Sequence, residues 1–282
     1  MEPTVAGLVL MAAVMHAGWN TLVKVGGEPA IRLAITNGFS ALVVLPLIFF
    51  LELPAPESWP YLLASLGVHI FYYSFLSMSY RAADLSLIYP IARGAAPPFV
   101  AIGAFLLAGE TLSFLGIASI GIISMAICLL ALHPSILRTS GKAVVYAFVT
   151  ALSIATYTVI DGTGARLSDN ALSYVSWLFL IDGVGFLAVI FILKRGALKT
   201  QLVANWKQGI MSGVLHVGSY GLVVWAMVMT PMTYVSALRE TSVIIAALIG
   251  AKFLKEPFGA RRIVSACLIV LGIVLLQKSG LS

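Results

Sequence analysis

The sequence predicts an all-α integral membrane protein in which ten transmembrane helices form two inverted five-helix repeats around a central cavity. Three observations lead to this fold class: the composition, the recurrence of apolar runs of membrane length, and an internal similarity between the two halves. The chain has 282 residues, of which 60% are hydrophobic and only 10% are charged, and its mean hydropathy is +1.03. About a quarter of the residues of a soluble domain are charged, so a water-soluble fold is excluded.

The apolar runs are long enough to cross a bilayer, since about 20 helical residues span about 30 Å of hydrocarbon. Short polar breaks such as ELPAPESWP (52–60) and KRGALKTQLVANWK (194–207) separate them. No positively charged residue precedes the first run, where the one charged residue is Glu2, and the run has no small-x-small cleavage site, so we expect a retained span and not a signal peptide. The expected helices are 5–24, 32–51, 60–80, 85–108, 112–131, 142–161, 170–193, 208–229, 232–251 and 260–277.

The basic residues are distributed unevenly between the connections. The basic residues in the even-numbered connections and at the termini are Arg166 and Lys278 only. The positive-inside rule therefore predicts cytoplasmic odd-numbered connections and both termini on the non-cytoplasmic side. Nucleic acid is not an expected partner of charges arranged in this way. The odd-numbered connections hold Lys24, Arg32, Arg81, Arg138, Lys142, Lys194, Arg195, Lys199, Lys207, Lys252, Lys255, Arg261 and Arg262.

Sequence signals for catalysis or for a cofactor are missing. Cys128 and Cys267 are isolated within expected spans, which predicts packing roles and neither a disulfide framework nor a metal site. The chain contains no HExxH, GxSxG or P-loop motif, and its four histidines lie in separate segments. We therefore expect no metal, no cofactor and no ATP-driven pump, and a membrane-embedded enzyme is the less favoured class of function.

An internal repeat divides the chain into residues 1–137 and 138–282. The segment RGAAPPFVAIGAFLLAGE (93–110) aligns with RETSVIIAALIGAKFLKE (239–256), and HIFYYS (69–74) aligns with HVGSYG (216–221). HAGWNTLVK (16–24) can likewise be laid over SIATYTVID (153–161). Because five is odd, the second half enters the membrane inverted. This plan is typical of secondary transporters that work by alternating access around a central site.

These motifs resemble the EamA-type branch of the drug/metabolite transporter superfamily, through YPIARGAAP (89–97), GET (109–111) and HAGWNTLVK. The resemblance covers the whole chain and implies that the fifth and tenth spans are peripheral. It implies a transporter of a small organic solute in the bacterial inner membrane, most similar to exporters of amino acids, including aromatic ones. The alternatives are an amine, a sugar or a nucleotide-sugar as solute. We expect a monomer, with an oligomer as the alternative.

Arg93 is the most unusual residue of the sequence, because a charge within a span faces a bundle interior or a watery cavity. Tyr89 and Arg93 share a helical face, and Pro90, Pro97 and Pro98 free backbone carbonyls and act as candidate hinges. Two interpretations remain open. Arg93 binds a substrate carboxylate from the cavity wall, or it is a structural tie between helices.

Three further ionisable residues lie within spans. Arg239 and Glu240 occupy the place in the second half that matches Arg93, and Glu240 is a candidate partner for Arg93 if the two spans meet. Asp182, in the middle of its span, is either a carrier of a coupling proton, which would make protons a partner, or a structural group that is paired or caps a helix.

Aromatic and histidine side chains at helical spacing suit an uncharged or zwitterionic organic solute, which needs apolar walls and a few placed polar groups. Packing and membrane-interface belts are the alternative explanation for many of these rings. His16, Tyr157 and His216 belong to the same stripes. The predicted substrate-binding residues are Trp19, His69, Tyr73, Tyr89, Arg93, Trp177 and Tyr220.

The charge distribution gives a prediction about topology. A reporter fused after Lys199 should be active as a cytoplasmic fusion, whereas a fusion at the C-terminus should report the non-cytoplasmic side, because the basic connections stay inside. Paired alkaline phosphatase and fluorescent-protein fusions measure both positions. A cytoplasmic C-terminus would contradict the orientation.

Overall fold

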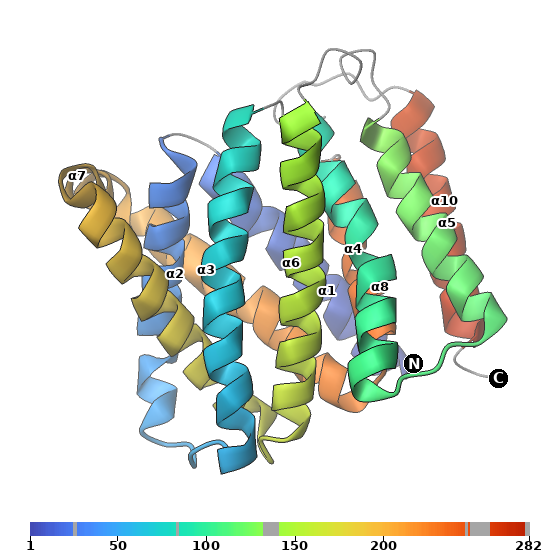
Figure 1. Cartoon of the computed structure of the whole chain (residues 1–282), viewed down its shortest axis with the longest axis horizontal. Helices are drawn as coiled ribbons and strands as arrows, with labels where there is room; N and C mark the ends of the chain where they lie inside the picture. Colours follow the sequence, from blue (N-terminus) through green and yellow to red (C-terminus); the bar gives the residue numbers. More distant parts are fainter. Residues whose placement is uncertain (25–26, 83–84, 132–140, 246–247, 249–259, 280–282) are drawn as a thin grey trace.

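The computed structural model describes residues 1–24, 27–82, 85–131, 141–245, 248 and 260–279, and it describes no side chains for residues 24, 80–82, 85–89, 131 and 260. All regular structure in this part of the chain is helical (Figure 1). A short 3₁₀ turn, η1 (Pro56–Ser58), precedes α3. The helices are α1 (Pro3–Lys24), α2 (Pro29–Ile48), α3 (Trp59–Ala82), α4 (Leu85–Ala108), α5 (Phe114–Ala131), α6 (Gly141–Arg166), α7 (Ala171–Met229), α8 (Met232–Arg239) and α10 (Ala260–Ser279).

The helices have the length and composition of membrane spans. Among the described residues, seven helices are long and apolar enough to cross a membrane, and the apolar helix Phe114–Leu130 is slightly shorter. The chain is therefore a multi-pass membrane protein. Seven of the expected spans correspond to one helix each, with boundaries that agree within a few residues: α1, α2, α3, α4, α5, α6 and α10.

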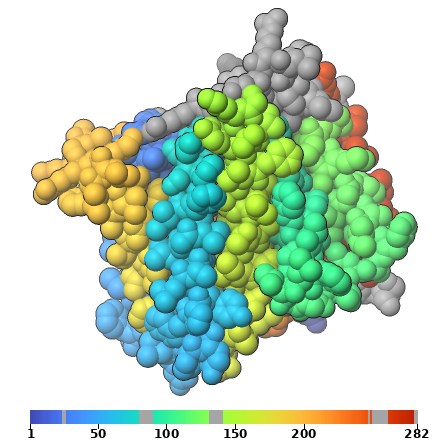
Figure 2. Space-filling view, viewed as in Figure 1, coloured from blue at the N-terminus to red at the C-terminus, as the bar shows by residue number. Residues whose placement is uncertain are grey.

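The seventh and eighth expected spans are joined in one element, α7. Its 59 residues would extend about 90 Å as a straight helix, about three times the hydrocarbon thickness. Non-helical backbone at Lys194 (φ −144°, ψ 36°) and Asn205 (φ −127°, ψ 18°) divides α7 into a first leg (171–193), an elbow (194–205) and a second leg (206–229). Figure 2 shows the elbow projecting from one side of the molecule.

The ninth expected span, which we predicted as a continuous helix over 232–251, is interrupted. The helix α8 ends at Arg239, Glu240 forms a turn, and residues 241–245 are helical again. At the turn the backbone N–H of Glu240 donates to Ala237 O at 3.2 Å. Residues 249–251 lie outside the described part of the chain. The break places Arg239 in the last turn of α8, where a cation is favoured because the terminal carbonyl groups carry partial negative charge.

The chain connections gather at two ends of the bundle. At the elbow end, Lys194 is paired with Glu28, and Arg32 Nη2 donates to Gln208 Oε1 at 2.6 Å. At the opposite end, Ala55 N donates to Ser168 O at 3.3 Å. The start of α1 and the end of α10 lie toward this opposite end (Figure 1).

A cluster of polar contacts, here called the clasp, joins several elements at that opposite end. Arg166 Nη2, at the end of α6, lies 2.7 Å from Glu110 Oε1, in the connection after α4. The same Glu110 oxygen accepts a hydrogen bond from Met232 N at 2.9 Å, and the other accepts from Thr233 N at 3.4 Å. Glu110 therefore caps the first turn of α8, where unpaired N–H groups favour an anion.

The helices pack in pairs that are distant in sequence. α3 packs against α6, and α1 packs against α7. α5 and α10 pack against each other at one edge of the bundle (Figure 1), as expected from the resemblance. The buried centre of the bundle includes Tyr174, Leu178, Ile154 and Met227.

The helix α2 packs closely against both legs of α7. A Cβ on Gly213 would lie 2.8 Å from Phe39 Cβ and 2.9 Å from its backbone carbon, and a Cβ on Gly183 would lie 2.7 Å from Ala41 Cβ. Carbon atoms at van der Waals contact are about 3.5–4.0 Å apart. The missing side chains therefore allow the two legs to hold α2 between them.

We predict that Gly213→Ala and Gly183→Ala destabilise the folded protein by about 1–3 kcal/mol, because an added methyl group overpacks the α2 contact. The matched control is Gly67→Ala in α3, where an added Cβ meets nothing within 4 Å. All three changes gain the same helix propensity. Fluorescence-detected gel filtration after a heating series measures the stability, and equal midpoints for the three variants would contradict the packing argument.

Candidate functional site

A small cavity lies at the centre of the bundle, where five helices meet. Its volume is about 20 Å³, and a water molecule needs at least about 10–15 Å³. The cavity therefore has room for about one water molecule in this conformation. It is lined by His16 and Trp19 of α1, His69, Tyr72 and Tyr73 of α3, Tyr157 of α6, Leu178, Phe179, Asp182, His216 and Tyr220 of α7, and Arg239 of α8.

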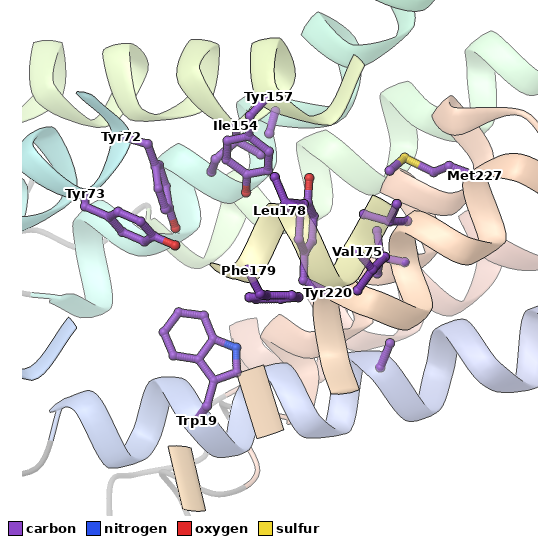
Figure 3. Close-up of a cluster of buried hydrophobic side chains, with 14 of the residues drawn as sticks. Trp19, Tyr72, Tyr73, Ile154, Tyr157, Val175, Leu178, Phe179, Tyr220 and Met227 are labelled. Carbon is purple, nitrogen blue, oxygen red and sulfur yellow. The ribbon is translucent and has the colours of Figure 1, made fainter. Parts of the chain in front are cut away.

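Aromatic rings form most of the cavity wall. The His69 ring stacks on Tyr157, with centroids 4.3 Å apart and an angle of 23° between the planes. On the other side the Trp19 and His216 rings are 4.7 Å apart. Figure 3 shows Trp19 from α1 and Tyr72, Tyr73 and Tyr157 from α3 and α6 converging on the region around Phe179. Such a wall offers an apolar solute group stacking and dispersion contacts.

Three polar side chains of the wall have atoms with no hydrogen-bond partner among the described groups: Trp19 Nε1, Asp182 Oδ1, and Arg239 Nε and Nη2. The exposed fractions of these residues are 3%, 5% and 2%. Most buried polar groups in folded proteins have a hydrogen-bond partner. Donors and an acceptor without protein partners at the wall of one cavity are groups that a water molecule or a polar ligand can bind.

Arg239 is held in the wall by its position at the end of α8. Its guanidinium carbon lies 5.9 Å from the centroid of the Tyr220 ring, a cation–π contact. The side chain presents a planar set of N–H donors that match a carboxylate. Arg239 is therefore the basic group of the cavity wall that is available to an anion.

Asp182 is paired on one side only. Its Oδ2 lies 2.9 Å from His69 Nδ1. The same nitrogen lies 2.9 Å from Ser65 Oγ, so Ser65 and Asp182 together orient the imidazole. Gly183 follows Asp182 and contacts α2, which fixes the position of this part of the first leg. Asp182 lines the cavity and its Oδ1 has no hydrogen-bond partner among the described groups, so the carboxylate is suited to bind a cation.

Asp161 is a second buried carboxylate, behind the aromatic wall. It is fully buried, and it accepts hydrogen bonds from Tyr220 Oη at 2.6 Å and Tyr174 Oη at 3.2 Å. Through Tyr220 it supports the ring that lies beneath Arg239. Its place near the end of an expected span made it a weaker candidate than Asp182 for a coupling carboxylate, with a position at the membrane interface as the alternative.

Arg93 does not belong to the cavity lining. Its Nε lies 2.9 Å from Glu240 Oε2, in ion-pair contact without the alignment of a hydrogen bond. Its Nη2 donates to Ser242 Oγ at 3.4 Å. The geometry is that of a structural tie between α4 and the break in the ninth span, and Glu240 is the partner that the repeat indicated.

The remaining expected site residues are divided between the cavity and the rest of the core. Trp19, His69, Tyr73, Tyr220, Asp182 and Arg239 line the cavity, whereas Trp177, which we expected there, packs against Trp59 with ring centroids 5.1 Å apart. The side chain of Tyr89 lies outside the described part of the chain. Pro90, Pro97 and Pro98 lie inside the continuous helix α4 and do not line the cavity. Leu178 and Phe179 line it without having been singled out in the sequence.

No group of three or more His, Cys, Asp or Glu side chains that could hold a metal ion occurs among the residues that the structure describes. The cavity wall consists of rings, one guanidinium and one carboxylate, which suits an organic solute better than a bare ion.

Membrane-length helices around a buried, polar-lined cavity define a membrane protein that can enclose a solute between its helices. Residues 141–277 match the EamA-like transporter family. The chain belongs to the EamA-type branch of the drug/metabolite transporter superfamily, and it is a membrane transporter of small solutes.

The fold agrees with that of a solved structure titled "Crystal structure of protein". The TM-score is 0.73 at 14% sequence identity, over 98% of this chain and 96% of that chain. At this identity the likeness shows the fold alone. None of the curated proteins matches the chain.

We predict that Glu240→Gln destabilises the protein by about 3–5 kcal/mol, because it leaves Arg93 as an uncompensated buried charge. Arg93→Gln has a similar cost, and the double variant Arg93→Gln/Glu240→Gln recovers part of it. The control is Glu57→Gln, at an exposed carboxylate. Thermal midpoints in detergent measure the cycle, and a Glu240→Gln variant as stable as the control would show that the pair is dispensable.

Proposed function

We propose that the protein is a secondary transporter of amino acids, with an aromatic or other neutral side chain, that works by alternating access and exports its solute across the bacterial inner membrane. The observation that carries this proposal is the unused polar atoms of Arg239 and Asp182 in one aromatic-walled cavity. In the proposal Arg239 binds the carboxylate of the solute and Asp182 binds its ammonium group. The aromatic rings hold the side chain.

The charges of the wall favour a zwitterion over the other solutes of this superfamily. A sugar carries neither charge and would leave Arg239 without a counter-ion in a low-dielectric site, which is costly. An amine would satisfy Asp182 but would be repelled by Arg239. An amino acid matches both groups, and Trp19 Nε1 offers its carboxylate a further donor.

The proposed mechanism uses the two halves of the chain as two inverted units. Residues that the repeat pairs, His69 with His216 and Tyr73 with Tyr220, line the same cavity from different helices, which supports the pairing. Polar contacts are present at both ends of the bundle, at the elbow end and at the clasp. A cavity of about 20 Å³ has no room for an amino acid, so in the proposal the two halves rock and open the cavity to one side at a time.

Counterflow in proteoliposomes tests the class of solute. We expect vesicles preloaded with L-phenylalanine or L-leucine to take up the labelled amino acid, and vesicles preloaded with glucose, a nucleotide-sugar or tryptamine to show no exchange. The reverse result, exchange of an amine or sugar without exchange of any amino acid, would overturn the assignment. Efflux from cells that express the protein tests the direction of transport.

We predict that Arg239→Ala raises the dissociation constant for the transported amino acid about ten- to hundredfold, because a charge-assisted hydrogen bond contributes about 1.5–3 kcal/mol. Arg239→Lys should give an intermediate value, since the charge remains and the planar fork is lost. The preference for L-phenylalanine over its amide, which lacks the carboxylate, should disappear in Arg239→Ala.

The matched control for this test is Arg32→Ala, which removes another buried arginine. Arg32 donates to Gln208 at the elbow end and does not line the cavity. Counterflow per folded transporter should keep the preference for the carboxylate in this control. If Arg239→Ala also retains the preference, the carboxylate is not bound at Arg239.

A further inference from the structure

The cavity contains a carboxylate that has two possible cationic partners. Asp182 Oδ2 contacts His69 Nδ1 at 2.9 Å, whereas Asp182 Oδ1 has no hydrogen-bond partner among the described groups. Both residues are more than nine-tenths buried and both line the cavity. The carboxylate therefore has one oxygen bound to an imidazole, which can take up a proton, and one oxygen that a cationic group of a solute could bind.

His69 lies in a setting that favours a bound proton over a passive packing role. Its neighbours include two carboxylates, Asp182 in direct contact and Asp161 behind Tyr220. The opposing positive charge is Arg239, which faces the same cavity from α8. The titratable and charged groups around His69 are Tyr72 and Tyr73 of α3, Tyr157 and Asp161 of α6, Asp182, His216 and Tyr220 of α7, Arg239 of α8 and His16 of α1.

The balance of charges at the buried centre is uneven without such a proton. Two cations, Arg93 and Arg239, face three anions, Asp161, Asp182 and Glu240. An uncompensated charge in the interior of a membrane protein is expensive. A proton held between His69 and Asp182 supplies the positive charge that the described groups around the cavity do not provide.

We propose that the His69–Asp182 pair binds one proton and that the ammonium group of the solute displaces it, so that the transporter exchanges a proton for an amino acid. This inference rests on the proposed function. When the cavity opens to one side, the His69 imidazolium gives its proton to water and the solute ammonium takes its place beside Asp182. When the cavity opens to the other side, the solute leaves and His69 takes up a proton from water.

The exchange follows from the geometry of a single carboxylate. Imidazolium and ammonium bound to the same carboxylate would be like charges a few ångströms apart in a medium of low dielectric constant, where repulsion is strong. Occupation by one therefore disfavours the other. When His69 is neutral and no solute is bound, Asp182 lacks a cationic partner. This disfavours the change between the two open conformations without a bound proton or solute.

The proton site can be tested without any solute, because the chain has only four histidines. In nanodiscs, ¹⁵N-histidine NMR at about pH 6 should show one imidazolium signal that is absent from His69→Gln. The signal should convert to neutral imidazole in Asp182→Asn and remain in His216→Gln. The last variant is a matched control, since His216 also lines the cavity but contacts Ser40 Oγ at 3.1 Å and no carboxylate. A neutral His69 throughout, or an imidazolium that persists in Asp182→Asn, overturns the proposal.

Exchange is tested in proteoliposomes with the membrane potential clamped at zero. Counterflow of L-phenylalanine at equal pH on both sides tests the proposed function alone. An inside-acid gradient of about one pH unit should then drive about tenfold accumulation of L-phenylalanine for a one-for-one exchange. In His69→Gln the accumulation should be lost, and the ratio of accumulation to counterflow is the readout.

The two proposals fail in different ways. Counterflow without gradient-driven accumulation refutes proton exchange and leaves the solute assignment standing. Absence of counterflow for every amino acid of the panel refutes the proposed function and the exchange with it, while the NMR result still decides whether His69 and Asp182 hold a proton.

Discussion

The ion pair between Arg93 and Glu240 is the contact on which the arrangement of the central site depends. A charge in the interior of a membrane protein needs a partner, because hydrocarbon and close-packed protein solvate it poorly. Glu240 lies at the break between α8 and residues 241–245, and Arg93 lies in the middle of α4. The pair therefore joins the helix that carries Arg93 to the helix that carries Arg239. With Glu240 in contact with Arg93, the neighbouring Arg239 is directed toward the cavity.

This arrangement explains why Arg239 has N–H groups available to a ligand in the cavity. If Arg239 were neutralised by Glu240, the cavity would have no cation for a carboxylate. α8 is held at both ends, at its first turn by Glu110 of the clasp and at its last by the turn at Glu240. Any opening of the clasp therefore moves a two-turn helix that carries Arg239. Opening the bundle at that end would thus change the position of Arg239 in the proposed solute site.

Much of the fold could be predicted from the sequence, since hydrocarbon thickness sets the length of each apolar run. The spans that became α1 to α6 and α10 agree with their helices for this reason. The repeat also indicated the pairing of His69 with His216 and of Tyr73 with Tyr220, which meet at one cavity. The break at Glu240 could not be predicted, because neither proline nor glycine occurs between Met232 and Ile249. Helix α4, with three prolines, is continuous instead.

The sequence could not show which of the two arginines lines the cavity, because the break at Glu240 could not be predicted. Arg93 and Arg239 have equivalent places in the repeat, and only the turn at Glu240 distinguishes them. Trp177 and Asp161 also show what the sequence could not predict. Trp177 lies in mid-span but packs against Trp59, whereas Asp161 lies near the end of a span but is buried in the core. Which side of a helix faces the cavity is decided by packing against helices far away in sequence.

A structure determined with the transported amino acid bound is the most direct test of the central claim. The account predicts density for the solute among Trp19, Asp182 and Arg239, with the carboxylate within hydrogen-bond distance of Arg239, and an expanded cavity around it. A solute bound against Arg93, with the Arg93–Glu240 pair broken and Arg239 turned away from the solute, would contradict the account.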